Sequence, residues 1–567
     1  MSLPLLALAF ILLLVVAYRM YGRWVARQFV IDDAHPTPAN KVNDGVDFVP
    51  TRPFYLFAQH FSAIAAAGPI AGPILACKTW GWLPSLLWIS FGVVLIGAVH
   101  DFSSLAASVR HGARSVADIT RDYLGPRAGA AMMAFIWIAL IYVIIAFAQL
   151  TASSFVVGTD ELQSVGHFNP GGAVAAAAVM YLLLAVVMGV VQRYLNPPLW
   201  LVTVIFVPAT LGVAWAGTKV STLIVMDFKA WALLILLYCA VASIVPVWAL
   251  LQPRGYLGGF VLYFALALGV IGVFFGGYEI KQEAFRTWDA TGMTGALFPF
   301  LFVTIACGAC SGFHGLVCSG TTSKQVDRES HMQPVGYGAM LAEGFVALIA
   351  LVTIMIVSQE SITGLEAGTI YGNGIGDFMT LIIGSQHREF AVTFGAMAFS
   401  TFVFDTLDVC TRLGRYIVQE LFGWRSRLGA VVCTLLTIGL PVYVVTVAPQ
   451  EAWKQFWTLF GASNQLLAAL TLLAITVWLY QARRRIWFTL VPMIFVLVIT
   501  LWSLMLLVIG NLKAASGFDL KMINAITAAA LIGLSLYLAV TALFKVRGER
   551  RASLVPEAAT TGAAGLT

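Results

Sequence analysis

The sequence is poor in charged residues. Asp, Glu, Lys and Arg make up 11% of its 567 residues, whereas they make up about 25% of an ordinary soluble domain. Hydrophobic residues account for 60%, and the mean hydropathy is +0.88. This composition excludes a soluble protein with a single membrane anchor and indicates a polytopic membrane protein. The net charge of +6 is no signal of nucleic-acid binding, because the basic residues lie in short loops between apolar spans.

Three further features are missing. The sequence has no G-x-x-x-x-G-K-S/T loop, which argues against an ATP-driven pump. Its first twenty residues are apolar but lack a basic segment and a small-residue cleavage site, so we expect a retained helix rather than a signal peptide. The seven cysteines fall mostly inside apolar spans, which argues against a secreted disulfide framework.

Apolar runs long enough to cross a bilayer recur along the whole chain. A spanning helix needs about 20 apolar residues, and we predict about fifteen such spans. They cover residues 3–19, 54–77, 82–108, 128–157, 171–191, 199–217, 230–252, 257–277, 296–320, 335–358, 389–411, 428–448, 453–480, 486–510 and 523–546. We expect the glycine-rich stretch Thr363–Ser385 to be a re-entrant or surface segment, and the small polar tail after Arg551 to be disordered.

Lysine and arginine are unevenly distributed over the loops between these spans. If the N-terminus is outside and the C-terminus inside, roughly 24 of the 33 basic residues lie in inner loops, as the positive-inside rule requires. Arg254 and Arg412 are counted among these loop residues. If one predicted span were absent, every later loop would lie on the opposite side of the membrane. The distribution of basic residues therefore supports the orientation and the odd number of spans together.

The second span is interrupted. The stretch Gln59–Cys77, QHFSAIAAAGPIAGPILAC, carries Gly68-Pro69 and Gly72-Pro73 in its middle. Each proline removes a backbone N–H and disfavours helical angles in the preceding residue. We therefore predict an unwound segment at Gly68–Gly72. Irregular backbone at membrane depth is tolerated only where it is buried in protein or lines a cavity, although a passive kink is the alternative.

The ninth span is interrupted too, and it runs in the opposite direction. Phe298–Gly320 contains Gly308, Gly312 and Gly315 close together, which predicts unwinding over Gly308–Gly315. Two interrupted spans of opposite direction point to an inverted-repeat secondary transporter. We predict a peripheral N-terminal helix and inner loop (1–53), a first repeat (54–217), an inserted helix pair (218–295), a second repeat (296–480), and C-terminal peripheral helices with a disordered tail (481–567).

An interrupted helix exposes N–H groups at one half-helix end and C=O groups at the other, which suit an anion and a cation respectively. We therefore expect the substrate to bind near the two breaks. Gln59 and His60 open the first interrupted span, and the polar part of span thirteen can line the same cavity. The predicted substrate-binding residues are Gln59, His60, Gly68, Pro69, Ala71, Gly72, Ser311, Gly312, Phe313, His314 and Asn464.

Span eleven carries two carboxylates inside the membrane, which is costly and usually functional. Asp405 and Asp408 share one helix face. Asp408 is expected to pair with Arg412, four residues on, as a structural pair near the inner interface. Asp405 lies deeper without a local partner, and burial favours its protonated form. We predict coupling-ion residues Asp405 and Asp408, with the hydroxyls of Ser400 and Thr401 as neighbours.

A different class of function is kept as the alternative. Cys307 and Cys310 form a C-x-x-C pair, which can indicate metal or redox chemistry. With His60, His314 and Cys318 they would make a membrane metal or redox protein. Cysteine is also a small apolar residue suited to helix contacts, so our main prediction includes no metal site and no cofactor.

Several long stretches resemble the carbon starvation protein A family. The resemblance runs from about residue 20 to about residue 545. It is carried by QHFSAIAAAGPIAGPILA (Gln59–Ala76), HDFSSLAASVRHGARSVADI (His100–Ile119), PVWALLQPRGYLGGF (Pro246–Phe260), SGFHGLVCSGTTSKQ (Ser311–Gln325), DTLDVCTRLGRYIVQE (Asp405–Glu420) and WTLFGASNQLLAAL (Trp457–Leu470).

The resemblance implies a secondary transporter of the bacterial inner membrane, related to the amino acid–polyamine–organocation superfamily. We expect an all-α fold of about 15 helices with a leucine-transporter-like 5+5 inverted repeat. The expected function is symport of a small carboxylate such as pyruvate, or of a short peptide, during carbon starvation. The coupling ion is a proton, with sodium as the alternative. No enzymatic activity and no nucleic-acid partner are expected, and the sequence leaves the oligomeric state open.

Overall fold

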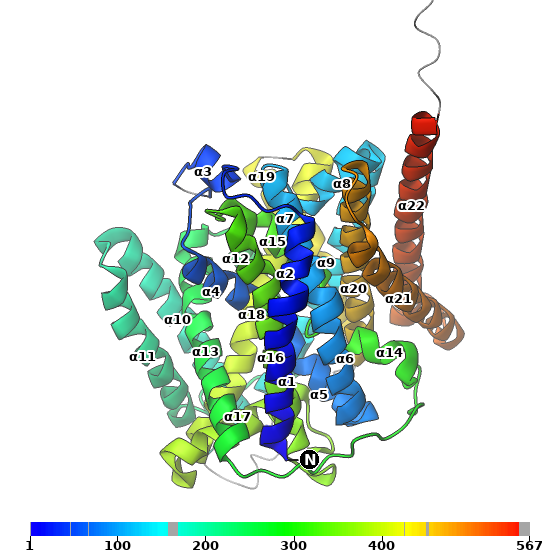
Figure 1. The fold of residues 1–567 in the computed structure, drawn as a ribbon. Helices are drawn as coiled ribbons and strands as arrows, with labels where there is room; N and C mark the ends of the chain where they lie inside the picture. Colours follow the sequence, from blue (N-terminus) through cyan, green and yellow to red (C-terminus); the bar gives the residue numbers. More distant parts are fainter. Residues whose placement is uncertain are drawn as a thin grey trace, which may run out of the picture.

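The computed structural model describes residues 2–45, 47–65, 67–156, 168–424, 426–448 and 453–554. These residues form helices and connecting loops; the only β pairings among them are two isolated bridges, Thr51 to Val326 and Asp289 to Ala296. The predicted all-α class is therefore confirmed. The helices stand roughly side by side around a central group (Figure 1). The end of the predicted disordered tail, residues 555–567, lies outside the described part of the chain.

The long helices alternate along the chain with short ones. Those of more than ten residues are α1 (Leu3–Ala17), α4 (Pro53–Ile64), α5 (Gly68–Trp80), α6 (Trp82–Gly92), α7 (Ala98–Arg110), α9 (Pro126–Phe155), α10 (Pro170–Leu195), α11 (Leu199–Lys219), α12 (Phe228–Ile244), α13 (Leu251–Phe275), α16 (Ala339–Met355), α17 (Ala367–Ile383), α18 (Arg388–Phe422), α19 (Arg427–Val447), α20 (Trp453–Gln481), α21 (Trp487–Ala514) and α22 (Leu520–Leu554). The short ones are α2 (Arg23–Gln28), α3 (Pro38–Val42), α8 (Val116–Leu124), α14 (Leu297–Thr304) and α15 (Gly312–Gly320).

In the described chain, twelve helices are long and apolar enough to cross a membrane, and the bent pair α4–α5 counts as a thirteenth if it is one span. The predicted spans 230–252 and 296–320 correspond to shorter helices, α12 and the separate α14 and α15. The predicted number of fifteen and the 5+5 repeat stay predictions. The stretch expected to be re-entrant or superficial, Thr363–Ser385, contains the helix α17, which packs along α18.

The core lies where α5, α9, α15, α16, α18 and α20 meet, and these helices bury apolar side chains against one another. The peripheral helices differ from them. The α10–α11 hairpin and the α21–α22 pair stand at opposite sides of the bundle (Figure 1). Large apolar residues such as Leu183, Val204 and Val498 are exposed there. A surface of this kind is the one that a bilayer covers, since lipid solvates apolar side chains.

The first interruption lies earlier than the sequence predicts. Helix α4 ends at Ile64 and α5 begins at Gly68, and the two axes differ by 46°. The predicted unwound segment, Gly68–Gly72, is the first turn of α5 instead. Proline costs little in a first turn, because the N–H it lacks has no partner there in any case. Gly68-Pro69 therefore starts a helix rather than breaking one, and Pro73 is accommodated inside it.

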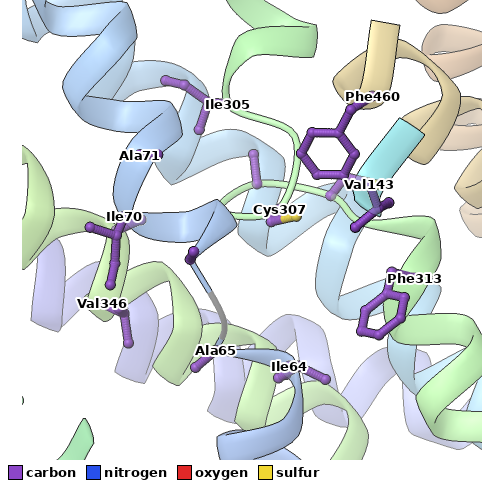
Figure 2. Packing of buried hydrophobic residues seen from close by; sticks show 14 of the residues in the cluster. Ile64, Ala65, Ile70, Ala71, Val143, Ile305, Cys307, Phe313, Val346 and Phe460 are labelled. Atoms are coloured by element: carbon purple, nitrogen blue, oxygen red, sulfur yellow. The ribbon is translucent and has the colours of Figure 1, made fainter. Parts of the chain in front are cut away.

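The glycines of this segment serve a close approach between the two interrupted helices. A Cβ added at Gly68 would lie 2.4 Å from Sγ of Cys307, and one at Gly72 would lie 2.7 Å from the Thr304 carbonyl oxygen. A Cβ at Gly308 would lie 3.4 Å from Cα of Pro69. The α5 start thus lies directly against the segment that joins α14 to α15, as Figure 2 shows around Ala71, Ile305 and Cys307. Small residues permit such backbone contacts between membrane helices.

The second interruption separates α14 from α15 at residues 305–311. The predicted unwound segment, Gly308–Gly315, is therefore correct only in its first half, because Gly312–Gly315 is the first turn of α15. A Cβ added at Gly312 would lie 2.4 Å from the Asn464 carbonyl oxygen and 2.5 Å from the Ala468 nitrogen. The glycine is required by the backbone of α20 rather than by unwinding.

Replacing Gly312 with alanine should destabilise the protein, because the added methyl group must separate α15 from the backbone of α20. Overpacking of this kind costs about 1–3 kcal/mol. Gly212→Ala is the matched control: Gly212 lies within α11, and an added Cβ there has no neighbour within 4 Å among the described residues. Thermal denaturation in detergent should show a lower midpoint for Gly312→Ala and an unchanged or raised one for Gly212→Ala. Equal midpoints would contradict the close α15–α20 contact.

Candidate functional site

The carbonyl end of α14 is buried, yet its backbone is satisfied. The last C=O groups of a helix have no partner within the helix, and here three side chains from other helices supply donors. The hydrogen bonds run from Trp88 Nε1 to the Ile305 carbonyl (3.0 Å), from Trp457 Nε1 to that of Thr304 (3.3 Å) and from Gln465 Nε2 to that of Phe302 (2.8 Å). The C=O end predicted to suit a cation is therefore already occupied by protein donors.

Asn464 of α20 holds the beginning of α15. Its Oδ1 accepts a hydrogen bond from the Phe313 backbone nitrogen (2.9 Å) and one from the Ser311 hydroxyl (3.3 Å). Its Nδ2 donates to Ser311 Oγ (3.0 Å) and to Cys307 Sγ (3.3 Å). The amide thus ties both ends of the unwound segment to α20. This contact brings together three of the predicted substrate-binding residues.

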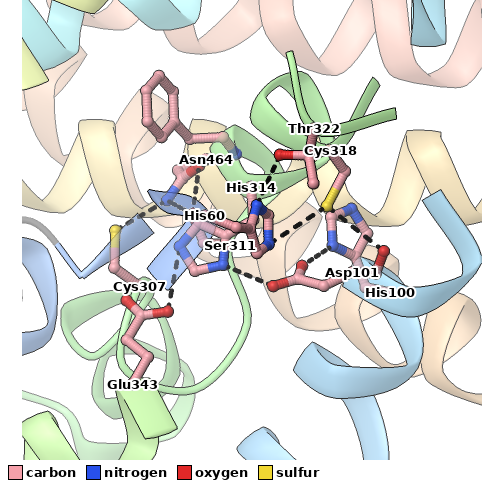
Figure 3. Close-up of polar contacts among 11 residues, drawn as sticks. His60, His100, Asp101, Cys307, Ser311, His314, Cys318, Thr322, Glu343 and Asn464 are labelled. Carbon is pink, nitrogen blue, oxygen red and sulfur yellow. Dashed lines mark hydrogen bonds and ion pairs between the residues drawn. The ribbon is translucent and has the colours of Figure 1, made fainter. Parts of the chain in front are cut away.

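Four buried titratable side chains from α7, α15 and α16 form a continuous line beside this segment. We call them the histidine–carboxylate chain: His100, Asp101, His314 and Glu343 (Figure 3). Asp101 Oδ1 lies 2.7 Å from Nδ1 of His100, and Oδ2 lies 2.8 Å from Nδ1 of His314. On the far side of its ring, His314 Nε2 lies 3.3 Å from Glu343 Oε2. All four side chains are at most 1% exposed.

The geometry of Asp101 fixes how protons are arranged in this chain. An ionised carboxylate only accepts hydrogen bonds, so both histidines present Nδ1–H to Asp101. His314 Nε2 then shares one proton with Glu343: either histidine is neutral beside a protonated acid, or imidazolium faces carboxylate. In both forms the chain carries one negative charge. Neither Glu343 oxygen has a hydrogen bond of normal geometry from any described residue, so the histidine is its main stabilising partner.

His60 joins the first interrupted helix to this region. Its Nδ1 lies 2.8 Å from Thr322 Oγ1, and its Nε2 lies 3.8 Å from Sγ of Cys318. Cys318 Sγ also lies 3.4 Å from the Asp101 backbone carbonyl. The two predicted histidines therefore lie in one buried cluster. Gln59 contributes differently: its backbone carbonyl accepts a hydrogen bond from Ser62.

The remaining predicted substrate residues of the first break are packed rather than open. Gly68, Pro69, Ala71 and Gly72 are all buried, and Ala71 belongs to the apolar cluster shown in Figure 2. Phe313 of α15 lies in the same cluster. These residues shape the contact between the interrupted helices, whereas the polar groups nearby come from α7, α16 and α20.

A second ionic cluster surrounds Arg254, near the start of α13. Its Nη2 lies 2.8 Å from Asp405 Oδ1, and its Nη1 contacts Asp408 Oδ2. The hydroxyl of Tyr238 on α12 donates to the same Asp408 oxygen (2.7 Å). The Arg254 side chain is fully buried, although the charge pattern of the loops counted it as an inner-loop residue.

The predicted Asp408–Arg412 pair is wrong. Arg412 Nη2 instead donates to two backbone carbonyls of the α12 end, at Ala242 (2.5 Å) and Val245 (2.6 Å). Residues four apart on a helix can pair, but the Arg412 guanidinium is bonded to carbonyls at the end of α12 instead. Asp405 was predicted to lack a partner nearby along the chain, and its ion-pair partner is Arg254 from α13.

The two carboxylates differ in access. The Asp408 side chain is fully buried, whereas the Asp405 side chain is 26% exposed. Among the described residues, neither of the hydroxyls predicted beside them is hydrogen-bonded to a carboxylate, and the Thr401 hydroxyl has no hydrogen-bond partner. Ser400 Oγ donates within its own helix to the Met397 carbonyl (3.0 Å), and Thr401 contributes its backbone carbonyl to Arg254 Nη2 at 3.4 Å.

The metal alternative finds no arrangement that fits it. Across the described ranges, no group of three or more His, Cys, Asp and Glu side chains is placed to hold a metal ion. Cys307, Cys310 and Cys318 are buried free thiols.

Sequence reasoning missed Arg254, His100 and Asp101 as site residues. Arg254 lies between two apolar runs, where a basic residue is typical of a loop. The available signal was indirect: two carboxylates on one face of α18 favour a buried cation as partner, but many basic residues lie at span ends and nothing in the pattern singles out Arg254. His100 and Asp101 lie near the end of the predicted span 82–108, and both side chains are fully buried.

Comparison with known proteins places this arrangement in a family. The family model described as carbon starvation protein CstA matches residues 1–372 and 363–503. The peptide transporter CstA of Campylobacter jejuni is 33% identical over 88% of this chain and 79% of its own length. The pyruvate/proton symporter BtsT of Escherichia coli is 31% identical over 89% of this chain and 81% of its own.

A further relative and a solved structure complete the comparison. The peptide transporter CstA of Bacillus subtilis is 31% identical over 87% of this chain and 88% of its own length. A manganese transporter from Eremococcus coleocola, 11% identical, aligns with a TM-score of 0.38 over 88% of this chain and 95% of its own. The family match covers most of the sequence, and the chain belongs to the carbon starvation protein CstA family.

Proposed function

We propose that this protein is a secondary transporter of the bacterial inner membrane that couples the inward movement of protons to the uptake of pyruvate or short peptides. Relatives over most of its length are named peptide transporters and a pyruvate/proton symporter. The observation that carries the proposal is the packing of two interrupted helices against each other beside buried titratable groups. The proposed function is transport rather than catalysis, with the N-terminus outside and the C-terminus inside.

We place the substrate near the two interruptions, where the sequence predicted it. The Phe313 N–H in the first turn of α15 already donates to Asn464, so the carboxylate of a substrate needs another partner. Pyruvate and a peptide share one group, the carboxylate, so a single anion-binding element suits both. A peptide also needs room for its amino end.

Two buried clusters could take up the coupling proton, and their exposure favours one of them. A proton must reach its acceptor from water. The histidine–carboxylate chain is at most 1% exposed, whereas the Asp405 side chain is 26% exposed. We therefore retain Asp405 as the coupling carboxylate. The histidine–carboxylate chain keeps its shared proton and ties α7, α15 and α16 together.

Transport by the reconstituted protein should concentrate its substrate. In vesicles with an alkaline interior, labelled pyruvate or dialanine should accumulate; for pyruvate, electroneutral cotransport with one proton gives about tenfold accumulation per pH unit. A protonophore should abolish accumulation. Equilibration without accumulation would indicate a passive channel, and accumulation driven only by a sodium gradient would replace the proton as coupling ion.

Substitutions in the two clusters should separate their roles. Glu343→Gln keeps the shape and the net charge of the histidine–carboxylate chain, because an amide can donate to neutral His314. Its proton-driven accumulation should stay within about twofold of wild type. Asp405→Asn should eliminate accumulation, since it removes the group that takes up the proton. The measurement is uptake by vesicles containing equal amounts of folded protein. Lost accumulation with Glu343→Gln, together with normal accumulation with Asp405→Asn, would reverse the assignment.

A further inference from the structure

We propose that Arg254 binds the carboxylate of the transported substrate, and that Asp405 occupies this position in the empty protein until a proton displaces it. The inference rests on the proposed function and names the group that recognises the substrate. Arg254 belongs to α13, which is not one of the interrupted helices.

Arg254 is held asymmetrically. Its Nη1 contacts Asp408, whose Oδ2 also accepts a hydrogen bond from the Tyr238 hydroxyl, so Asp408 is fixed by two helices. Its Nη2 contacts Asp405, which has no other ion pair in the described part of the chain. Asp408 is fully buried and Asp405 is partly exposed. The replaceable ligand of Arg254 is therefore Asp405.

One edge of the guanidinium has unused capacity. Arg254 Nε has no hydrogen-bond acceptor among the residues described, and Nε–H and one Nη–H form the parallel pair that binds a carboxylate in bidentate fashion. Of the two nitrogens on this edge, Asp405 contacts only Nη2, and the Thr401 carbonyl oxygen also lies 3.4 Å from Nη2. The Arg254 side chain is itself buried, so a substrate carboxylate takes both positions only after Asp405 has moved away.

Adjacent glycines of α13 connect this site to the first interruption. A Cβ added at Gly258 would lie 2.7 Å from Asp405 Oδ2, and one at Gly259 would lie 3.5 Å from Cβ of Ser62. Ser62 is in the last turn of α4, two residues before its end at Ile64. The Tyr263 hydroxyl further ties α13 to the Ala58 carbonyl of α4 (3.1 Å). Helix α13 therefore contacts the Asp405 carboxylate with one residue and the last turn of α4 with the next.

Binding of a substrate anion requires uptake of one proton if the net charge of the site is to stay unchanged. Arg254 with two carboxylates carries one negative charge, and a substrate anion added to it would create a second charge in a poorly solvated site. A proton taken from water by Asp405 removes one charge, breaks the Nη2–H to Oδ1 ion pair and leaves a neutral acid. Nη2–H and Nε–H then donate to the substrate carboxylate. The net charge is the same before and after, and one proton accompanies each monocarboxylate.

The other titratable groups around Asp405 do not supply this switch. They are Asp408 and Arg412 on α18, Tyr238 and Cys239 on α12, and Tyr181 on α10, whose hydroxyl donates to the Arg254 carbonyl (2.9 Å). Tyrosine and cysteine ordinarily titrate above about pH 8, and arginine does not titrate. Asp408 is held by two donors. Only Asp405 combines partial exposure with a single ion-pair partner.

The test is equilibrium binding to the purified full-length protein between pH 5.5 and 8.5. Uptake by wild-type protein is measured first with pyruvate and with dialanine, and the compound taken up is the probe; uptake of neither would refute the proposed function itself. Wild-type affinity should weaken by up to about tenfold per pH unit at the alkaline end. Asp405→Asn should bind with an affinity that varies less than about twofold over the range, since it mimics the protonated acid. Retained pH dependence in this variant would overturn the proposal.

Substitution of the arginine completes the test. Arg254→Gln should abolish binding at every pH, whereas Arg412→Gln, which removes a buried guanidinium bonded to backbone carbonyls, should leave it measurable. If Arg254→Gln does not fold, the double variant Arg254→Gln/Asp408→Asn restores the original net charge and serves in its place. Methyl pyruvate or an amidated dipeptide, which lack the carboxylate, should not compete. Normal binding by a folded Arg254 variant would overturn the inference while leaving the transport function intact.

Discussion

Helix ends inside a membrane must have their backbone groups satisfied by protein, and this constraint organises the centre of the molecule. The end of α14 is acceptable there because the indoles of Trp88 and Trp457 donate to its carbonyls, and the start of α15 because Asn464 accepts from Phe313. The two indole donors come from α6 and α20, so both of these helices must pack against the interruption. Glycines then let α5 approach the joining segment closely enough to exclude lipid.

Buried charge is the second constraint, and the protein meets it in two different ways. The histidine–carboxylate chain carries a net charge of minus one, and so does Arg254 together with its two ionised carboxylates. In the histidine–carboxylate chain that charge is spread over groups that can share protons, and the chain is sealed from solvent. Around Arg254 the positive charge is permanent, and one of its two carboxylates is accessible. The first arrangement suits a stable scaffold, and the second suits exchange of one anion for another.

Much of this could be predicted from the sequence, because hydropathy and glycine content respond to the same constraints. Most long helices of the described chain begin and end within a few residues of a predicted apolar span, and both interruptions lie close to the predicted ones. The error at Gly68–Gly72 has a physical cause: a proline that ends one helix can equally begin the next, and only the position of the following turn decides. The Arg254 site could not be predicted in this way. An arginine near a span end is typical of a loop, and its carboxylate partners lie about 150 residues away along the chain.

The helices predicted to be an insertion carry part of the charge site. α12 and α13 supply Tyr238 and Arg254 to the carboxylates of α18, and α13 also lies against the end of α4. Gly258 contacts Asp405 of α18 and Gly259 contacts Ser62 of α4, so α13 links these two helices directly. A carrier that changes access by moving one group of helices against another needs its ion-binding groups at such a boundary. Of the pair predicted to be inserted, α13 provides the Arg254 cation and also contacts the interrupted helix α4.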